Sequence, residues 1–581
     1  MKRSNQLNHR LQWTGVVLAA ALSLAPVAAG HAAAQGGNVA AAHGTPPSAT
    51  DAPLGKNVDG RTAPLFENLG KHTHPVTTKS PRAQRYFDQG LILSYAFNHA
   101  ESARAFKEAA RLDPECAMAW WGVAFVLGPN INAAMDKAVV PEAWDALRKA
   151  QALADKATAR EQAYIAALAK RYSSDPNADR KALDAAFADA MRDVMRRFPD
   201  DNDAAVIFAE SVMDTRPWNY WTKEGKPQPG TMEVIETLES VVRRDPDHPG
   251  ALHFHIHVME ASKSPERALG SAHRLRHLVP GAGHLVHMPA HIYIRTGLYH
   301  EASLANERAI LSDNAYFATC RAQGLYPLGY RPHNHHFLWA AETMLGRGEK
   351  AIAAAKQLAV HTDQKLLKEP GMGTLQHFSM TPLYAQVRFG RWDDVLATPA
   401  PDADMVYPTG VWTYAHGTAF LRTGKLPEAE TALERLEEIA KEPELAKIAF
   451  WEINTAKDVL AVAVEALRGD VLAAKGDYAG AVAALKQAVA KEDALNYDEP
   501  QPWFLPMRQA LGAVLLDAGR AAEAEAVYRE DLERNPENGW SLYGLLRALR
   551  AQGKGGEAAT VEQRFRNAWA HADTVLTASR F

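Results

Sequence analysis

Residues 290–302 read Ala-His-Ile-Tyr-Ile-Arg-Thr-Gly-Leu-Tyr-His-Glu-Ala. This stretch joins an apolar helix to Gly297, which allows a tight turn, and to a small residue, Ala302, where a second helix can cross closely. The same arrangement returns along the chain at residues 346–351, 390–395, 424–429, 476–481, 519–524 and 553–558. The pattern predicts an array of antiparallel helix pairs.

The bulk composition agrees with such an array. The 581 residues exceed what one hydrophobic core usually serves, which favours several domains or a repeat array. Hydrophobic residues make up 47% and charged residues 23%, which is ordinary for a soluble protein. The formal net charge is -4 and Lys and Arg are scattered, so no basic surface for nucleic acid is expected.

The beginning of the chain has the pattern of a secretory signal peptide. Lys2, Arg3 and Arg10 precede an apolar run over residues 13–29, and small residues lead to a cleavage site near Ala34. No later stretch is long and apolar enough to span a membrane. We therefore expect a periplasmic or secreted protein with no membrane span after cleavage, with a signal peptide at 1–34 and a flexible linker at 35–81.

The turn glycine, the small residue and a proline that ends the second helix resemble the tetratricopeptide repeat, whose unit is 34 residues long. Pro246 and Pro280 are 34 residues apart, as are Ala268 and Ala302. The resemblance covers roughly residues 82–570 and implies an all-α, tetratricopeptide-type α-solenoid, without implying any chemistry. The expected parts are N-terminal repeats with an insertion at 82–200, histidine-rich central repeats at 201–400, and C-terminal repeats with a cap at 401–581.

Two aromatic stretches depart from the generic repeat. One runs over residues 95–99 and 116–122, and the other over residues 499–503 and 538–540. We interpret both as capping repeats with aromatic packing. Together they are also similar to sequences of exported bacterial repeat proteins, a similarity that implies no activity.

Histidines concentrate in the central repeats. The chain has 23, and the repeat register places a set of them on the groove-facing side of successive first helices, at i, i+3 and i+7 spacing. His253 and His287 are 34 apart, as are His257 and His291, so these pairs are structural equivalents. The predicted metal ligands are His253, His257, Glu260, His284, His287, His291, His333 and His336. Glu210 and Asp214 fall on the same side of the preceding repeat.

Imidazoles on facing helices predict a transition-metal site, since neutral imidazole binds Cu, Zn, Fe or Ni. Eight candidate ligands are more than one ion uses, so we expect two metals, or one metal with orienting partners. The ligand supply resembles that of dinuclear copper oxidases, which makes copper the first expectation and zinc or iron the alternatives. Glu260 is a candidate general base, and Arg295 either orients an anionic substrate or pairs with Glu260 or Asp214.

The function expected first is therefore a metal-dependent oxidoreductase acting on a small molecule, with a hydrolase second. Two alternatives remain open: a scaffold that binds a peptide or protein in its concave groove, and a metal storage or delivery protein. The chain has only two cysteines, Cys116 and Cys320, which form either a disulfide or two separate buried thiols.

Overall fold

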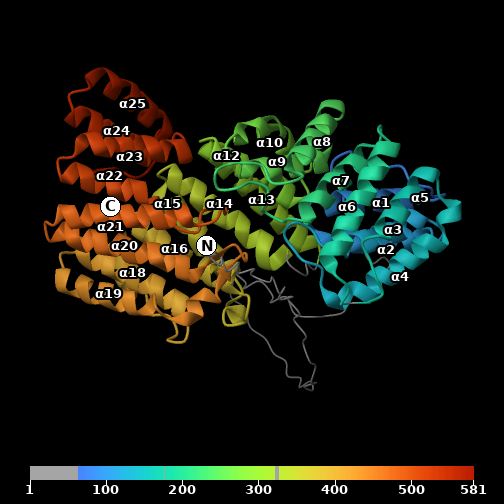
Figure 1. Cartoon of the computed structure of the whole chain (residues 1–581), viewed down its shortest axis with the longest axis horizontal. Helices are drawn as coiled ribbons and strands as arrows, with labels where there is room; N and C mark the ends of the chain where they lie inside the picture. Colours follow the sequence, from blue (N-terminus) through green and yellow to red (C-terminus); the bar gives the residue numbers. More distant parts are fainter. Residues whose placement is uncertain (1–62, 176, 321–325) are drawn as a thin grey trace, which may run out of the picture.

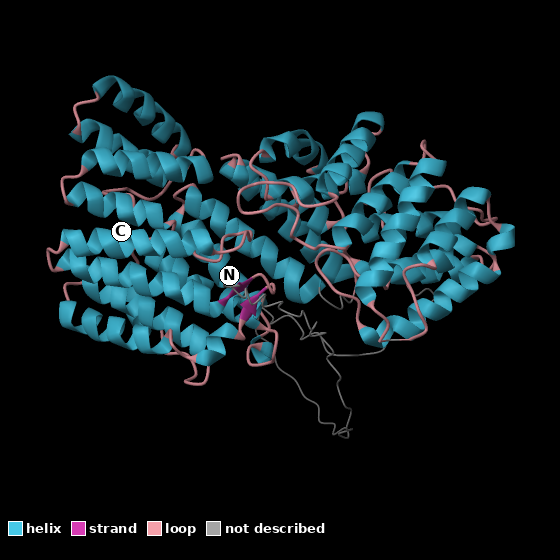
Figure 2. Ribbon diagram, in the orientation of Figure 1, coloured by secondary structure: helices cyan, strands magenta, loops and turns pink. Residues whose placement is uncertain are grey.

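The protein is described by a computed structural model that covers residues 63–175, 177–320 and 326–581. The described chain is almost entirely helical, as Figures 1 and 2 show, and it forms an all-α solenoid of the tetratricopeptide type. The predicted signal peptide and the linker up to residue 62 lie outside the described residues.

The elements follow one another as antiparallel helices joined by short turns. The first part of the chain contains α1 (Pro81–Tyr95), α2 (His99–Leu112), α3 (Ala117–Val126), α4 (Val140–Ala152), α5 (Ala159–Leu168), α6 (Arg180–Arg197), α7 (Asn202–Asp214) and α8 (Thr231–Arg244). The central part contains α9 (Pro249–Glu260), α10 (Leu269–Leu275), α11 (Gly283–His287), α12 (Pro289–Arg295), α13 (Tyr299–Thr319), α14 (Arg331–Met344), α15 (Gly348–His361), α16 (Gly373–Arg388) and α17 (Trp392–Ala397).

The last part contains α18 (Val406–Arg422), α19 (Leu426–Ile439), α20 (Ala456–Ala474), α21 (Tyr478–Ala494), α22 (Met507–Asp517), α23 (Ala521–Arg534), α24 (Gly539–Ala551) and α25 (Gly555–Ala568). A two-stranded antiparallel hairpin, β1 (Ala449–Phe450) and β2 (Asn454–Thr455), precedes α20. Single turns of 3-10 or π-helix connect some helices: η1 (Lys137–Val139), η2 (Ala154–Lys156), η3 (Pro265–Ala268), η4 (Tyr326–Tyr330), η5 (Gln364–Leu366) and η6 (Pro443–Ala446).

The turn between the two helices of a repeat is built as the sequence predicts. Gly297 ends α12 with φ +79°, a left-handed conformation that costs little only for glycine. The six other predicted turn glycines share this conformation: Gly346, Gly390, Gly424, Gly476, Gly519 and Gly553. The small residue five positions after each of the seven is buried, which lets the paired helices approach closely. These observations confirm the repeat register.

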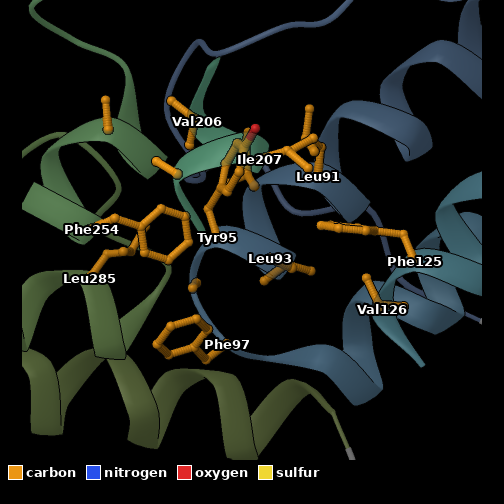
Figure 3. Close-up of a cluster of buried hydrophobic side chains, with 14 of the residues drawn as sticks. Leu91, Leu93, Tyr95, Phe97, Phe125, Val126, Val206, Ile207, Phe254 and Leu285 are labelled. Atoms are coloured by element: carbon orange, nitrogen blue, oxygen red, sulfur yellow. The ribbon is translucent and has the colours of Figure 1, made fainter. Parts of the chain in front are cut away.

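Two hydrophobic cores run along the solenoid and meet at α14. Phe337 and Ala341 of this helix belong to the core of the first half, and Leu338 and Trp339 belong to the core of the second half. Figure 3 shows part of the first core, where Tyr95 and Phe97 at the end of α1 lie beside Phe254 of α9 and Leu285 of α11. The helices α9, α11 and α12, which carry most of the predicted histidines, belong to the first core, and α14, which carries His333 and His336, joins it to the second.

Residues 63–80 form a strap that packs on the first repeats, so the expectation of a flexible linker up to residue 81 is wrong for this segment. His72 Nε2 lies 3.0 Å from Asp203 Oδ1, and His74 Nδ1 lies 2.8 Å from Asp203 Oδ2. Asp203 is on α7 and also accepts a hydrogen bond from the Tyr95 hydroxyl at 2.6 Å. The strap is held by buried ion pairs between its histidines and Asp203. These pairs could not be predicted from the low hydrophobicity of the segment or from the repeat spacing.

Two further features of the fold bear on the sequence predictions. No helix among the described residues is long and apolar enough to cross a membrane. Cys116 and Cys320 are both free thiols, and burial raises their pKa values to about 11 and about 12. The two thiols are thus separate, as in the second of the two cysteine alternatives, but only Cys116 is buried and Cys320 is partly exposed.

Candidate metal centre

Six of the predicted histidines lie in two groups of three at the middle of the chain. His253 and His257 of α9 meet His284 of α11 in the first triad, and all three are almost fully buried. The second triad joins His287 of α11, His291 of α12 and His333 of α14. Within each triad the candidate ligand nitrogens lie within 4.8 Å of one another.

The triads arise from the repeat register. His253 and His287, and likewise His257 and His291, occupy equivalent positions on first helices of adjacent repeats. Across this helix contact the ring of His253 meets that of His284, and the ring of His257 meets that of His291. Pro289 has no backbone N–H and divides the second of these helices into α11 and α12. His284 therefore belongs to the first triad while His287 and His291 belong to the second.

The first triad has two histidines whose ring protons are fixed by their neighbours. His253 Nδ1 lies 2.6 Å from the carbonyl oxygen of Tyr95, which can only accept, so Nδ1 carries the proton. His257 Nδ1 lies 2.9 Å from Glu260 Oε1, which fixes the same tautomer. Both Nε2 atoms therefore present a lone pair, and neither has a hydrogen-bond partner in the described protein. Both nitrogens of His284 are also buried without a partner.

The second triad repeats this arrangement. His287 Nδ1 lies 2.7 Å from Asn306 Oδ1, and the Asn306 amide nitrogen donates to the Ala302 carbonyl, so Oδ1 is the acceptor and Nδ1 the donor. His291 Nδ1 lies between two carboxylates, 2.6 Å from Glu260 Oε2 and 2.8 Å from Glu499 Oε2. Neither contact has the angles of a hydrogen bond. Both histidines thus point Nε2 into the triad.

The two Nε2 atoms of His287 and His291 lie only 2.9 Å apart. Two lone pairs repel at this distance, so a cation must lie between them, either a proton or a metal ion. A metal at the usual distance of about 2.0–2.1 Å from each nitrogen would be held at an angle of about 90°. The spacing is therefore compatible with metal coordination.

Glu260 and Glu499 place negative charge behind the second triad. Burial alone would lower the pKa of His291, but the facing carboxylates raise it to about 10. Burial would raise the pKa of Glu260, yet His291 and His257 lower it to about 2. Burial raises the pKa of Glu499 to about 7. One anionic and one weakly acidic carboxyl group thus orient a ligand histidine, as carboxylates do in metal sites.

The other histidines of the two triads are poised to stay neutral. Burial lowers the pKa values of His253, His284, His287 and His333 well below the ordinary value of 6.5, and it lowers that of His257 to a lesser degree. Neutral imidazole is the form that binds a metal. At neutral pH these side chains are therefore ready to act as ligands.

Aromatic side chains enclose both triads. Phe97 lies 4.7 Å, ring centre to ring centre, from His253, and Phe337 lies 4.4 Å from His291. Trp218 meets His257 and Trp451, in the β1–β2 turn, meets His333. Phe97, Trp218 and Trp451 all have positive φ, which is costly for bulky residues and occurs mostly where function requires it.

The histidines were expected on the groove-facing side of the first helices, and the structure shows that this part of the groove is covered. Five of the six triad histidines have exposures of 0–3%, and only His333 is partly exposed. Tyr330, at the end of η4, lies 4.7 Å from the ring of His284. The described turn η4, the bulky residues with positive φ and Glu499 fill the space that a simple repeat would leave open.

Besides Glu260, which lies behind the histidine rings, four residues singled out from the sequence lie outside the two triads. Arg295 donates to the backbone carbonyls of Glu260 and Ser262, rather than pairing with a carboxylate. His336 stacks on Trp339 and faces His377, in neither triad. Asp214 binds Arg171 at 2.6 Å, and Glu210 lies beside this pair, with a pKa raised well above its ordinary value by burial.

Apart from Glu260, which was predicted as a metal ligand or general base, the residues that orient the ligands were not predicted from the sequence. Glu499 comes from the segment between α21 and α22, more than two hundred positions after His291, and Asn306 lies on α13. Tyr95, Phe97 and Glu499 fall in the two stretches that depart from the generic repeat and that we interpreted as caps. The departure of these two stretches from the repeat pattern was the feature of the sequence that pointed to these residues.

A second histidine cluster surrounds Asp203 but is a hydrogen-bonded network. His248 caps α9 by accepting from the Ala251 backbone N–H at Nδ1, so its proton is on Nε2, which lies 3.1 Å from Asp203 Oδ1. His72, His74 and Tyr95 occupy the remaining directions of the carboxylate. The network holds Tyr95, whose carbonyl orients His253, and so supports the first triad.

Comparisons with known proteins add little beyond the fold. The sequence matches no family model and none of the curated proteins. Among solved structures it is similar to the human IFIT1 dimer with m7Gppp-AAAA, at 12% identity over 85% of this chain and 91% of that chain, with a TM-score of 0.30. It is similar to the APC/C hetero-tetramer Cut9–Hcn1 at 14% identity over 80% of this chain and 76% of that chain, with a TM-score of 0.28. It is similar to yeast Tom70 at 10% identity over 84% of this chain and 91% of that chain, with a TM-score of 0.27. Such scores are too low to say anything about function, and the solenoid assignment rests on the helix pairs and their register.

Proposed function

We propose that the two triads bind two transition-metal ions, and that the protein is a metal-dependent oxidoreductase of the cell envelope acting on a small molecule. The observation that carries this proposal is the set of four histidines, His253, His257, His287 and His291, each with Nδ1 engaged and Nε2 directed into its triad. Ligand histidines in metal sites show this pattern of orienting partners.

The donor set favours copper. Six imidazoles and no thiolate suit copper or zinc, and copper(II) binds nitrogen ligands most tightly among the common divalent ions. Dinuclear zinc or iron hydrolases usually place bridging carboxylates between the metals. Here Glu260 and Glu499 lie against the Nδ1 side of histidine rings, which is the orienting position. Zinc and iron therefore come second.

When bound, a copper pair supplies reversible one-electron chemistry at each ion. The residues of this chain keep five of the six imidazoles, all but that of His291, neutral through burial. They fix the ring orientation through Tyr95, Asn306 and Glu260, and exclude water through Phe97 and Phe337. A buried, rigid ligand set supports catalysis better than storage, which needs easy exchange. Burial of the triads also speaks against a peptide-binding groove as their purpose.

Metal analysis of the purified protein after loading and removal of excess ion tests this proposal. We expect two copper ions per chain in the unaltered protein and about one in His284→Ala and in His333→Ala. His277→Ala is the matched control, because His277 is exposed and lies outside both triads. Less than one ion per chain, or equal content in all four proteins, would contradict the proposal.

The oxidoreductase part needs a separate readout. With hydroquinone as reductant, two molecules release four electrons and four protons and reduce one O2 to two H2O, so an oxygen electrode follows the reaction. We expect oxygen uptake by the copper-loaded protein and its loss in both triad variants. Full copper binding with no uptake for hydroquinone, catechol or other small phenols would favour metal storage or delivery.

A further inference from the structure

A pocket lies next to the second triad. It is formed by α12, the start of α13, α14 and the non-helical segment 495–506, and it encloses about 690 Å³ including its open mouth. Its walls include the apolar side chains of Ile294, Trp339, Met344, Pro500 and Phe504. They provide an apolar surface suited to a flat ring.

The same walls hold an unusual number of polar atoms without partners. These atoms are buried, lack any hydrogen-bond partner in the described protein and can donate: Tyr299 Oη, Trp339 Nε1, Thr343 Oγ1, Tyr497 Oη and Trp503 Nε1. Buried polar groups in proteins nearly always have a partner, and leaving one unsatisfied costs stability. Their gathering around one pocket indicates a ligand rich in hydrogen-bond acceptors.

Four charged or acidic side chains line the pocket, Arg295, Asp498, Glu499 and Arg534, and two of them, Arg295 and Glu499, define two ends for such a ligand. Arg295 uses Nε and one terminal nitrogen on backbone carbonyls, and its guanidinium lies 5.5 Å from the Tyr497 ring. Its remaining terminal nitrogen has no partner among the described residues, so this end attracts a carboxylate. Glu499 provides the other end, because its Oε1 is buried in the wall without a partner and accepts from a hydroxyl.

We propose that this pocket binds a small hydroxylated aromatic carboxylate, with the carboxylate toward Arg295 and Tyr497 and the hydroxyl toward Glu499. Glu499 Oε2 lies 2.8 Å from His291 Nδ1, so the bound hydroxyl is one side chain away from a ligand histidine. The role of this molecule as a substrate rests on the proposed function. Its binding does not, because none of the residues that face it in the pocket belongs to either histidine triad.

Calorimetric titration with 4-hydroxybenzoate, done on the metal-free and on the copper-loaded protein, tests the proposal. We expect saturable binding to both forms. The methyl ester lacks the charge and benzoate lacks the hydroxyl, so each should bind at least about 10-fold more weakly than 4-hydroxybenzoate. Tyr497→Phe should weaken binding of the acid about 3- to 10-fold, and in this variant the gap between acid and ester should shrink.

Tyr220→Phe is the matched control, because Tyr220 also has a buried hydroxyl without a partner but lies outside the pocket. This variant should bind as the unaltered protein does. Absence of binding at millimolar 4-hydroxybenzoate, or equal weakening by both tyrosine variants, would overturn the proposal. Binding without metal uptake would refute only the proposed function, and metal uptake without binding would refute only the pocket.

Discussion

Asn306 shows, at the scale of one residue, how the free nitrogen of a histidine is chosen. Its amide nitrogen donates to the Ala302 carbonyl, which turns Oδ1 toward His287 Nδ1. The proton of the ring is thereby fixed on Nδ1, and Nε2 faces His291. A side chain that touches no metal can therefore contribute strongly to metal affinity.

We predict that Asn306→Ala lowers the copper affinity of the second triad about 10- to 100-fold, the usual effect of removing a partner that orients a ligand. Competition with a chelator of known affinity measures it. Asn314→Ala is the control, since Asn314 is an exposed residue of the same helix. Equal affinities in the two variants would show that the ring orientation of His287 does not depend on Asn306.

The ligand residues themselves follow from the sequence, whereas their orientation does not. A 34-residue register is enough to align His253 with His287 and His257 with His291. It says nothing about Glu499, which reaches His291 from a distant segment without repeat spacing. It also leaves His336 and Arg295 on the predicted face, where close packing and backbone carbonyls give them other partners.

At the scale of an element, the turn after α12 links distant repeats. A Cβ at Gly297 would lie 2.8 Å from the backbone oxygen of Pro536, which follows α23. Gly424 has the same φ of +79° but no neighbour within 4 Å of that position. The sequence pattern predicts both turns and cannot distinguish them, because the contact depends on how far the solenoid curves.

We predict that Gly297→Ala destabilises the protein more than Gly424→Ala. Both variants place a side chain at positive φ, which costs about 1–2 kcal/mol, and only the first also meets a backbone atom, for an added 1–3 kcal/mol or so. Urea unfolding of the two variants gives the comparison. Equal losses would mean that the turn after α12 does not pack tightly on the last repeats.

A second element, the strap over residues 63–80, depends on one carboxylate. Asp203→Asn removes the charge that faces His72, His74 and His248, which should cost about 3–5 kcal/mol as for other broken buried ion pairs. The strap should then open, and trypsin should cleave faster after the exposed Lys71. Asp200→Asn changes an exposed neighbour and should leave the cleavage rate unchanged. A similar cleavage rate in both variants would mean that contacts other than those with Asp203 hold the strap.

At the scale of the whole molecule, the central histidines join the two halves of the solenoid. Most of their pKa values are lowered by burial, so the unfolded chain binds more protons than the folded chain below the ordinary pKa of 6.5. Stability supplied by such groups is present above pH 6.5 and is lost as the pH falls toward their folded values. His72 and His74 have raised pKa values and act in the opposite sense, losing their contribution as the pH rises.

Buried carboxyl groups with raised pKa values, such as Asp313 and Glu499, also act in the opposite sense. Because the histidines with lowered pKa values outnumber these carboxyl groups and the histidines with raised values together, we predict that the metal-free protein loses stability between pH 7 and pH 5. Urea unfolding in the presence of a chelator measures the free energy across this range. Bound copper should steepen the loss, since protons compete with the metal for the same nitrogens. A free energy that is constant or rises toward pH 5 would mean that the histidines are not buried as neutral groups.

The central claim is that two metal ions lie in two histidine triads between the halves of this solenoid. Anomalous diffraction at the copper edge from crystals of the loaded protein tests it most directly. We predict two peaks, one among His253, His257 and His284 and one among His287, His291 and His333. A single peak elsewhere, for example beside Asp203, or no peak within either triad, would contradict the account.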